Sequence, residues 1–173
     1  MSYGNLPRII DPRKLAEREI RLTGTASVEK MPRLASYLCG DSDVVDVDLL
    51  FSLDELRIRI ITGNAKGRVH MTCQRCLEPV EVDVQAEFNL AIAFNEDKAK
   101  QLPRYYDPLI VEDEEIELLD IVEEELILSL PLVPYHADCS IQTQFGDEDM
   151  AKEAEIEKPN PFSVLAQLKA DKK

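Results

Sequence analysis

Apolar and polar residues alternate through the middle of the chain in a pattern that predicts β-strands. The clearest stretch runs from Val80 to Phe94, where nearly every second residue is apolar, as expected for a strand with one buried face. Shorter stretches of this kind occupy residues 19–26, 44–53, 56–62 and 65–72. Their connections are short, and Gly63-Asn64 is typical of a two-residue hairpin turn. The pattern predicts an antiparallel β-meander or partial barrel of five or more strands.

Apolar residues at helical spacing predict a layer that covers this sheet. Between Glu117 and Leu130, apolar positions and carboxylates follow the pattern of an amphipathic helix with an acidic outer face. A second helix is expected at residues 27–38, although Pro32 is tolerated there only if the helix begins late. Asp11 followed by proline predicts the capped start of a short helix. Together these elements predict the α+β fold class.

The composition is that of a globular protein, with 173 residues, 45% apolar and 31% charged. No apolar run approaches the roughly 18 residues of a membrane-spanning helix. The N-terminus lacks the basic and apolar regions of a secretory signal, so we expect a cytoplasmic protein. In such a chain the four cysteines are more typical of thiols or metal ligands than of disulfides.

The net charge of −14 is unevenly distributed along the chain. Residues 105–151 contain 14 Asp and Glu and no Lys or Arg, whereas the rest of the chain carries 20 acidic and 20 basic residues. An acidic segment is a poor phosphate-binding surface and suits a basic protein partner, although a solvated helix face is an equally good interpretation. The candidates for contact with RNA lie instead on the predicted hairpins, at Arg57, Arg59, Arg68 and Arg75. The first three could share one sheet face if the register permits, with an ordinary solvated face as the alternative.

Two cysteines lie at the turn between the last two strands and indicate a metal site. Cys73 and Cys76 have the Cys-x2-Cys spacing that recurs in zinc sites. Among the other Cys and His residues, His136 and Cys139 repeat the same spacing after a proline-bounded loop and form the best second half. However, 59 residues separate Cys76 from His136, against roughly 12–20 in small zinc modules. One zinc ion on these four residues is the prediction, and unliganded thiols are the alternative.

The pattern divides the chain into a domain at residues 1–141, a flexible acidic linker at 142–157 and a short helical motif at 158–173. In the last segment a capping residue and a first-turn proline precede an apolar stripe. A helix of about two turns is unstable alone in water, so it must dock on its own domain or on a partner. The predicted partner-binding residues are Pro159, Asn160, Pro161, Phe162, Leu165 and Leu168.

These motifs together resemble a known family. The segments are Cys73-Gln-Arg-Cys-Leu, Leu119-Asp-Ile-Val-Glu-Glu-Glu-Leu-Ile-Leu-Ser-Leu-Pro-Leu-Val-Pro and Lys158-Pro-Asn-Pro-Phe. In this order they are similar to the large ribosomal RNA subunit accumulation protein family (YceD), over nearly the whole chain. The resemblance implies a bacterial factor for synthesis, processing or stability of large-subunit (23S) ribosomal RNA, with metal and nucleic-acid binding suggested. Other branches of the family carry a cysteine-rich stretch where this chain has only His136 and Cys139.

Two classes of function follow from these observations. The first is a non-catalytic factor in ribosome biogenesis that binds a ribosomal protein, a processing factor or precursor ribosomal RNA, and neither a membrane nor a small-molecule substrate. The second is a metal-dependent RNA-processing enzyme or a thiol redox protein. Zinc held by four protein ligands has no open position for hydrolysis, and the cysteine pair lies between strands instead of at a helix N-terminus. The sequence therefore favours the non-catalytic factor.

Overall fold

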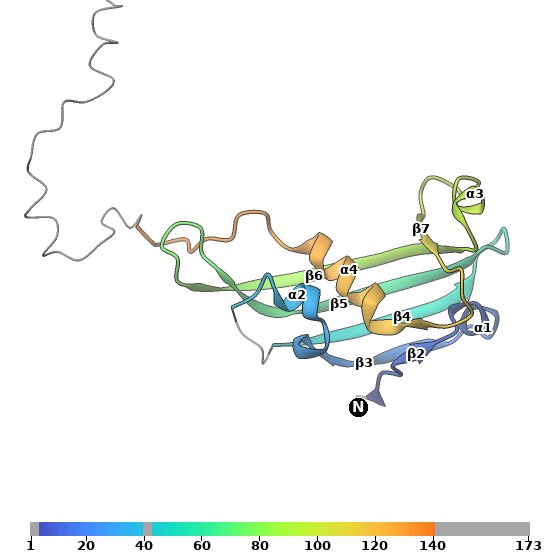
Figure 1. Ribbon diagram of the computed structural model, residues 1–173, viewed down its shortest axis with the longest axis horizontal. Coiled ribbons are helices and arrows are strands. Elements are labelled where there is room, and N and C mark those ends of the chain that lie inside the picture. The colour runs from blue at the N-terminus through green and yellow to red at the C-terminus, as the bar shows by residue number, and fades with distance from the viewer. Residues whose placement is uncertain (1–3, 40–42, 141–173) are drawn as a thin grey trace, which may run out of the picture. The chain divides into compact units, whose positions relative to one another are not determined.

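A six-stranded sheet forms the body of the computed structural model, which describes residues 4–39 and 43–140 (Figure 1). In chain order its strands are β1 (Gly4–Asn5), β3 (Arg21–Ser27), β4 (Val44–Leu53), β5 (Arg59–Thr72), β6 (Pro79–Ala93) and β7 (Asp107–Ile110). Two further strands, β2 (Ile9–Ile10) and β8 (Ile116–Glu117), pair with each other in a small second sheet. The predicted linker at 142–157 and motif at 158–173 lie outside the described residues.

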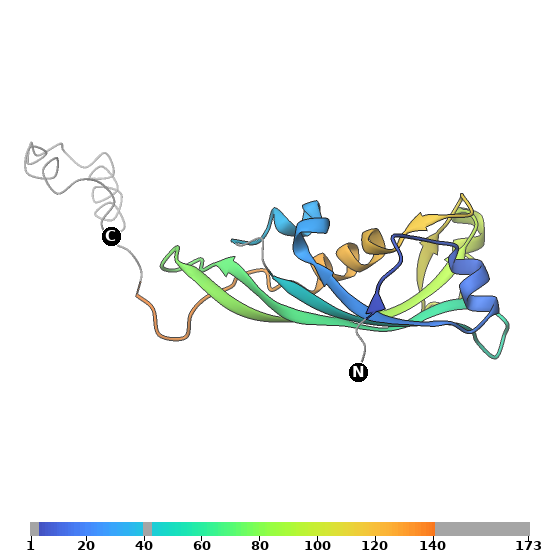
Figure 2. The same cartoon turned by 90° about the horizontal axis from the view of Figure 1, so that it is seen from below.

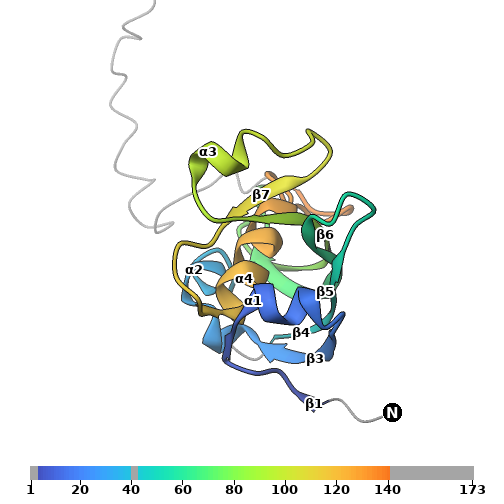
Figure 3. The ribbon, with the colours of Figure 1, turned by 90° about the vertical axis from the view of Figure 1, so that its right-hand side faces the viewer.

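The four long strands form the predicted antiparallel meander, in the order β3-β4-β5-β6. Both edge strands pair in parallel instead, β1 with β3 and β7 with β6, so the sheet is mixed. The sheet curves around the helices on one side without closing into a barrel, and its other face is open (Figures 2 and 3). The α+β fold class is confirmed, with parallel pairing at the edges as the difference.

The predicted hairpin at Gly63-Asn64 is wrong, because β5 runs through it without a break. Gly63 has φ +145° and pairs with Leu49 on one side and Phe88 on the other. A Cβ atom at this position would lie 2.0 Å from the carbonyl oxygen of Asp48. The glycine therefore permits a close approach between two strands and does not make a turn.

The predicted covering helix is present as α4 (Leu118–Ser129). Leu118, Ile121, Val122 and Leu126 are buried and belong to the same apolar core as the inward side chains of β4, β5 and β6. The capped N-terminal helix is present as α1 (Pro12–Glu17), where the Asp11 carboxylate accepts a hydrogen bond from the Lys14 amide. A single turn, α3 (Glu96–Ala99), follows β6. Within residues 4–39 and 43–140, no helix is long and apolar enough to cross a membrane.

The helix expected at residues 27–38 is much shorter than predicted. It is divided into a 3₁₀ turn, η1 (Val28–Lys30), and α2 (Pro32–Ala35), because proline excludes helical geometry from the residue before it. The expectation that the carboxylates of α4 all lie on its outer face is wrong for Glu123, which is 3% exposed. Its Oε1 accepts hydrogen bonds from the amides of Arg33 (2.7 Å) and Leu34 (3.0 Å), and so caps α2.

Candidate metal centre

The first two candidate ligands lie in the tight turn that joins β5 to β6. The Cys73 amide donates to the carbonyl oxygen of Glu78 (2.9 Å), and the Leu77 amide donates to that of Cys73 (3.0 Å). Leu77 takes a left-handed conformation with φ +64°, which allows the chain to reverse immediately after Cys76. Within this turn the sulfurs of Cys73 and Cys76 lie within 4.8 Å of each other, close enough to share one metal ion.

The second pair of ligands comes from the segment that follows α4. This segment is fastened to the turn by main-chain and side-chain bonds, since the Gln74 amide donates to the carbonyl oxygen of Pro134 (2.9 Å). The Arg75 guanidinium donates to the carbonyl oxygen of Cys139 (3.1 Å) and lies 5.3 Å from the centre of the Tyr135 ring. Arg75 therefore joins the two halves of the site by a hydrogen bond and a cation–π contact.

The structure brings together all four residues that the spacing singled out. One ligand atom from each of Cys73, Cys76, His136 and Cys139 lies within 4.8 Å of every other. The sulfurs of Cys73 and Cys139 are 3.7 Å apart, and the Cys76 sulfur is 3.3 Å from His136 Nδ1. A tetrahedral zinc ion with bonds of about 2.3 Å to sulfur and about 2.0 Å to nitrogen would place such pairs about 3.5–3.8 Å apart. The donor set therefore fits zinc in both atom type and separation.

The electrostatics of the cluster also favour a cation. Burial raises the pKa of Cys73, but the backbone amides of Cys76, Arg75 and His136 and a hydrogen bond with the Cys76 side chain outweigh it and lower this pKa to about 5. Burial, followed by hydrogen bonds and charge repulsion from the sulfurs of Cys73 and Cys76, raises the pKa of Cys139. The site thus favours the thiolate form of Cys73 and disfavours that of Cys139. A bound cation would remove the repulsion between the two thiolates.

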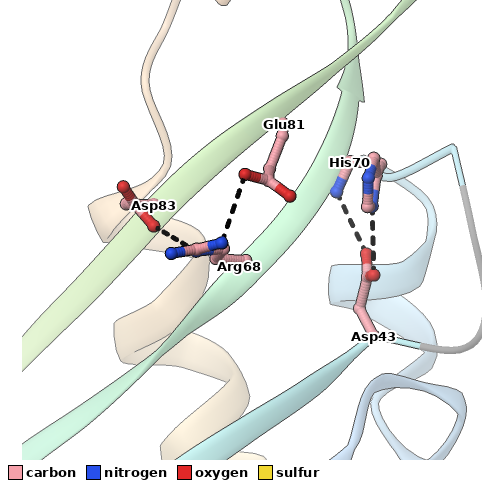
Figure 4. A network of polar contacts seen from close by, with 5 residues as sticks. All are labelled: Asp43, Arg68, His70, Glu81 and Asp83. Atoms are coloured by element: carbon pink, nitrogen blue, oxygen red, sulfur yellow. Dashed lines mark hydrogen bonds and ion pairs between the residues drawn. The ribbon is translucent and has the colours of Figure 1, made fainter.

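The other Cys and His residues lie outside this cluster. His70 Nδ1 is 3.1 Å from an oxygen of Asp43, whose other oxygen accepts a hydrogen bond from the His70 amide (Figure 4). The Cys39 sulfur is 3.0 Å from the Thr72 hydroxyl. All four cysteines are free thiols. Cys39 is therefore a natural control for substitutions at the metal centre.

The arginines singled out for RNA contact are dispersed over the molecule. Arg68 lies on the open sheet face and pairs with Asp83 (3.1 Å) and Glu81 (3.6 Å), as Figure 4 shows. Arg59 pairs with Glu17 of α1 (2.6 Å), so it points to the helix-covered face. These two arginines are nine positions apart in β5, an odd number, and therefore do not share a face.

The remaining two arginines have different surroundings. Arg57 lies in the β4–β5 turn, and Arg75 lies in the candidate metal centre. The role of Arg75 as the link between the two ligand pairs was not predicted from the sequence. The available signal was an arginine between the two cysteines of one pair and an aromatic residue, Tyr135, beside the histidine of the other.

Comparison with known proteins agrees with the resemblance of the motifs. The sequence model of a family described as large ribosomal RNA subunit accumulation protein YceD matches residues 61–169, which include both ligand pairs. The large ribosomal RNA subunit accumulation protein YceD of Haemophilus influenzae is 37% identical over 177 aligned residues, covering 98% of this chain and 99% of that protein. No solved structure matches the chain. The chain belongs to the large ribosomal RNA subunit accumulation protein YceD family.

Proposed function

We propose that the protein is a non-catalytic cytoplasmic factor for the synthesis, processing or stability of 23S ribosomal RNA. It acts in ribosome biogenesis by binding a protein or RNA partner. The name of the Haemophilus influenzae relative supports the connection with large-subunit RNA. The non-catalytic part of the proposal rests on the cluster of four protein donors, which would leave a tetrahedral zinc ion no open position for water or substrate.

In this proposal Cys73, Cys76, His136 and Cys139 hold one zinc ion, whose contribution is structural. Three thiolates and a neutral imidazole around zinc leave about one net negative charge, and the Arg75 guanidinium lies beside it to balance it. The ligands join the β5–β6 turn to the segment after α4. These four residues therefore hold the segment after α4 in place, and they do not activate a water molecule.

A thiol redox protein is the second candidate, and one observation favours it. Cys73 and Cys139 have sulfurs 3.7 Å apart, and the pKa of Cys73 is lowered to about 5 by amide donors that outweigh its burial. A disulfide needs only a modest approach, because its sulfurs lie about 2.05 Å apart. Metal content decides between the two candidates. Protein purified without chelator should carry about one zinc per chain, with all four ligands protected from alkylation.

The test of function is the amount of 23S ribosomal RNA in cells that lack the protein. Deletion should lower the ratio of 23S to 16S RNA, and the wild-type chain should restore it. Cys76→Ser should restore it poorly, whereas Cys39→Ser, outside the cluster, should restore it fully. An unchanged ratio after deletion would contradict the proposal. Metal-dependent cleavage of labelled precursor RNA by the pure protein would make it an enzyme instead.

A further inference from the structure

An apolar groove lies beside the candidate metal centre and is lined by none of its four ligands. Its volume is about 450 Å³, and it is bounded by Tyr37 after α2, by the end of α4 and by the β5–β6 turn. Its outer wall is the segment Pro131–Pro134, and we call the whole feature the α4 groove. Leu132 on this wall is 99% exposed, and Leu128, which follows the lining residue Ile127 on α4, is 75% exposed. Large apolar side chains exposed together at a groove are typical of a binding surface.

The α4 groove is held open by bonds already present in the described residues. Pro134 is buried, and its carbonyl oxygen accepts the Gln74 amide at 2.9 Å. Two prolines, at positions 131 and 134, restrict the backbone of the wall. On the opposite side, the Glu123 carboxylate fixes α2 and therefore the start of the segment that carries Tyr37. A groove formed in advance binds a partner without the cost of ordering it first.

The surface next to the groove is acidic. The solvent-facing stripe of α4 carries Asp120, Glu124 and Leu128 at successive intervals of four residues, so carboxylates lead directly to the exposed apolar end. Glu125 is half-buried, and burial together with the nearby Asp107 and Glu124 raises its pKa. No Lys or Arg occurs from residue 105 to residue 140. The Arg33 guanidinium is 3.8 Å from Glu124, but this ion pair is exposed and therefore weak.

We infer that the α4 groove binds a basic amphipathic segment of another protein, with apolar side chains in the groove and Lys or Arg along the carboxylates of α4. This inference rests on the proposed function and names the chemistry of its partner. RNA does not fit, because its phosphates would meet the carboxylates of α4, whose exposed ion pair with Arg33 is weak. A second copy does not fit either, since it would bring the same carboxylates and a net charge of −14 to the same place.

A direct test uses the full chain and a fluorescent peptide of leucine and lysine that forms an amphipathic helix. Binding is measured by fluorescence anisotropy. A leucine–glutamate peptide and a labelled RNA are measured in the same way for comparison. The double variant Leu128→Asp, Leu132→Asp should weaken peptide binding by about tenfold or more, because a charge replaces one apolar side chain on the groove wall and another beside it. The double variant Asp120→Lys, Glu124→Lys should weaken it as well and reduce its dependence on salt.

The matched control is Leu56→Asp, because Leu56 is 68% exposed and lies in the β4–β5 turn, far from the groove in sequence. This variant should bind the lysine peptide as the wild type does. Equal losses in the control and the groove variants, or absence of binding to the wild type, would overturn the inference. So would tighter binding of the glutamate peptide or RNA, or concentration-dependent dimers that Leu132→Asp abolishes.

A crosslinking experiment in cells tests this inference separately from the proposed function. A photo-crosslinking amino acid replaces Leu132 in one strain and Leu56 in another, and the crosslinked products are identified. A basic protein crosslinked through a Lys- or Arg-rich segment at position 132 and not at position 56 supports the inference. A crosslink from position 132 to RNA, to a second copy of the protein or to another residue of the same chain would overturn it. If deletion leaves the 23S to 16S ratio unchanged, the proposed function fails whatever the peptide result.

Discussion

Replacing Glu123 with alanine tests how α4 holds α2 in place. Glu123 is 3% exposed, and one carboxylate oxygen accepts both the Arg33 amide (2.7 Å) and the Leu34 amide (3.0 Å). These amides lie in the first turn of α2, where the chain has no helical acceptor to offer them. Met31, the residue at the N-cap of α2, supplies no side-chain hydrogen bond of its own. Glu123 is therefore a cap provided from another helix.

The expected loss of stability can be worked out from these contacts. Removing an N-cap acceptor costs about 0.5–2 kcal/mol. A buried donor left without a partner costs about 1–3 kcal/mol, and the Leu34 amide is buried. Both costs concern the same two amides and therefore do not add in full. We expect Glu123→Ala to lower the free energy of unfolding by about 2–4 kcal/mol. For a chain of this size that corresponds to a fall in melting temperature of roughly 5–15 °C.

Urea denaturation and thermal melting would measure the effect, with the neighbouring residue as control. Glu124 is exposed, and its only ion-pair partner among the described residues is Arg33 at 3.8 Å, so Glu124→Ala should change stability by less than about 1 kcal/mol. Glu123→Gln keeps an acceptor oxygen and should lose less than Glu123→Ala. Equal stability of Glu123→Ala and Glu124→Ala would refute the capping argument.

Three further outcomes are expected. Cys76→Ser should reduce bound zinc well below one equivalent per chain, whereas Cys39→Ser should leave zinc unchanged; equal loss in both would contradict the assigned ligands. Gly63→Ala should lower the free energy of unfolding by at least about 2 kcal/mol, because its Cβ would meet the Asp48 carbonyl; stability within 0.5 kcal/mol of wild type would rule this out. Deleting residues 158–173 should lower the 23S to 16S ratio as far as deletion of the whole protein does, at an unchanged melting temperature. A lower melting temperature would indicate that the motif docks on the protein itself, and no change in either quantity would refute a binding role for it.

The parts of the fold that local pattern determines could be predicted from the sequence. Val80 to Ala93 alternates because one face of β6 is buried, and the stripe on residues 118–129 follows the helical period for the same reason. Gly63-Asn64 shows where this reasoning fails. The pair is as suitable for a turn as for a strand, and the choice depends on the Asp48 carbonyl, which lies 15 residues earlier and contributes nothing to the local pattern.

Glu123 illustrates the same limit for a charged residue. At its position a carboxylate predicts exposure, because an isolated buried charge is costly. The cost is offset by the amides of Arg33 and Leu34. These amides are free of helical acceptors because Pro32 makes the expected helix begin late, as α2. Two local rules, for proline and for glutamate, therefore combine into a contact that neither predicts. The parallel pairing of β1 and β7 at the sheet edges is equally a consequence of long-range packing.

The candidate metal centre could be predicted as two separate ligand pairs, because the spacing within each pair is local. Each pair of ligands lies in its own short turn and keeps the same spacing, which is visible in the sequence. The meeting of the halves is not local. From Cys76 the chain leaves along the 15 residues of β6, about 50 Å of strand, and returns through the 12 residues of α4, about 18 Å of helix. The 59 residues between Cys76 and His136 are therefore the part of the chain that runs along the sheet and returns through α4. Because a metal bound to all four ligands would close a loop of that length, it would bind well only after β6 and α4 are in place.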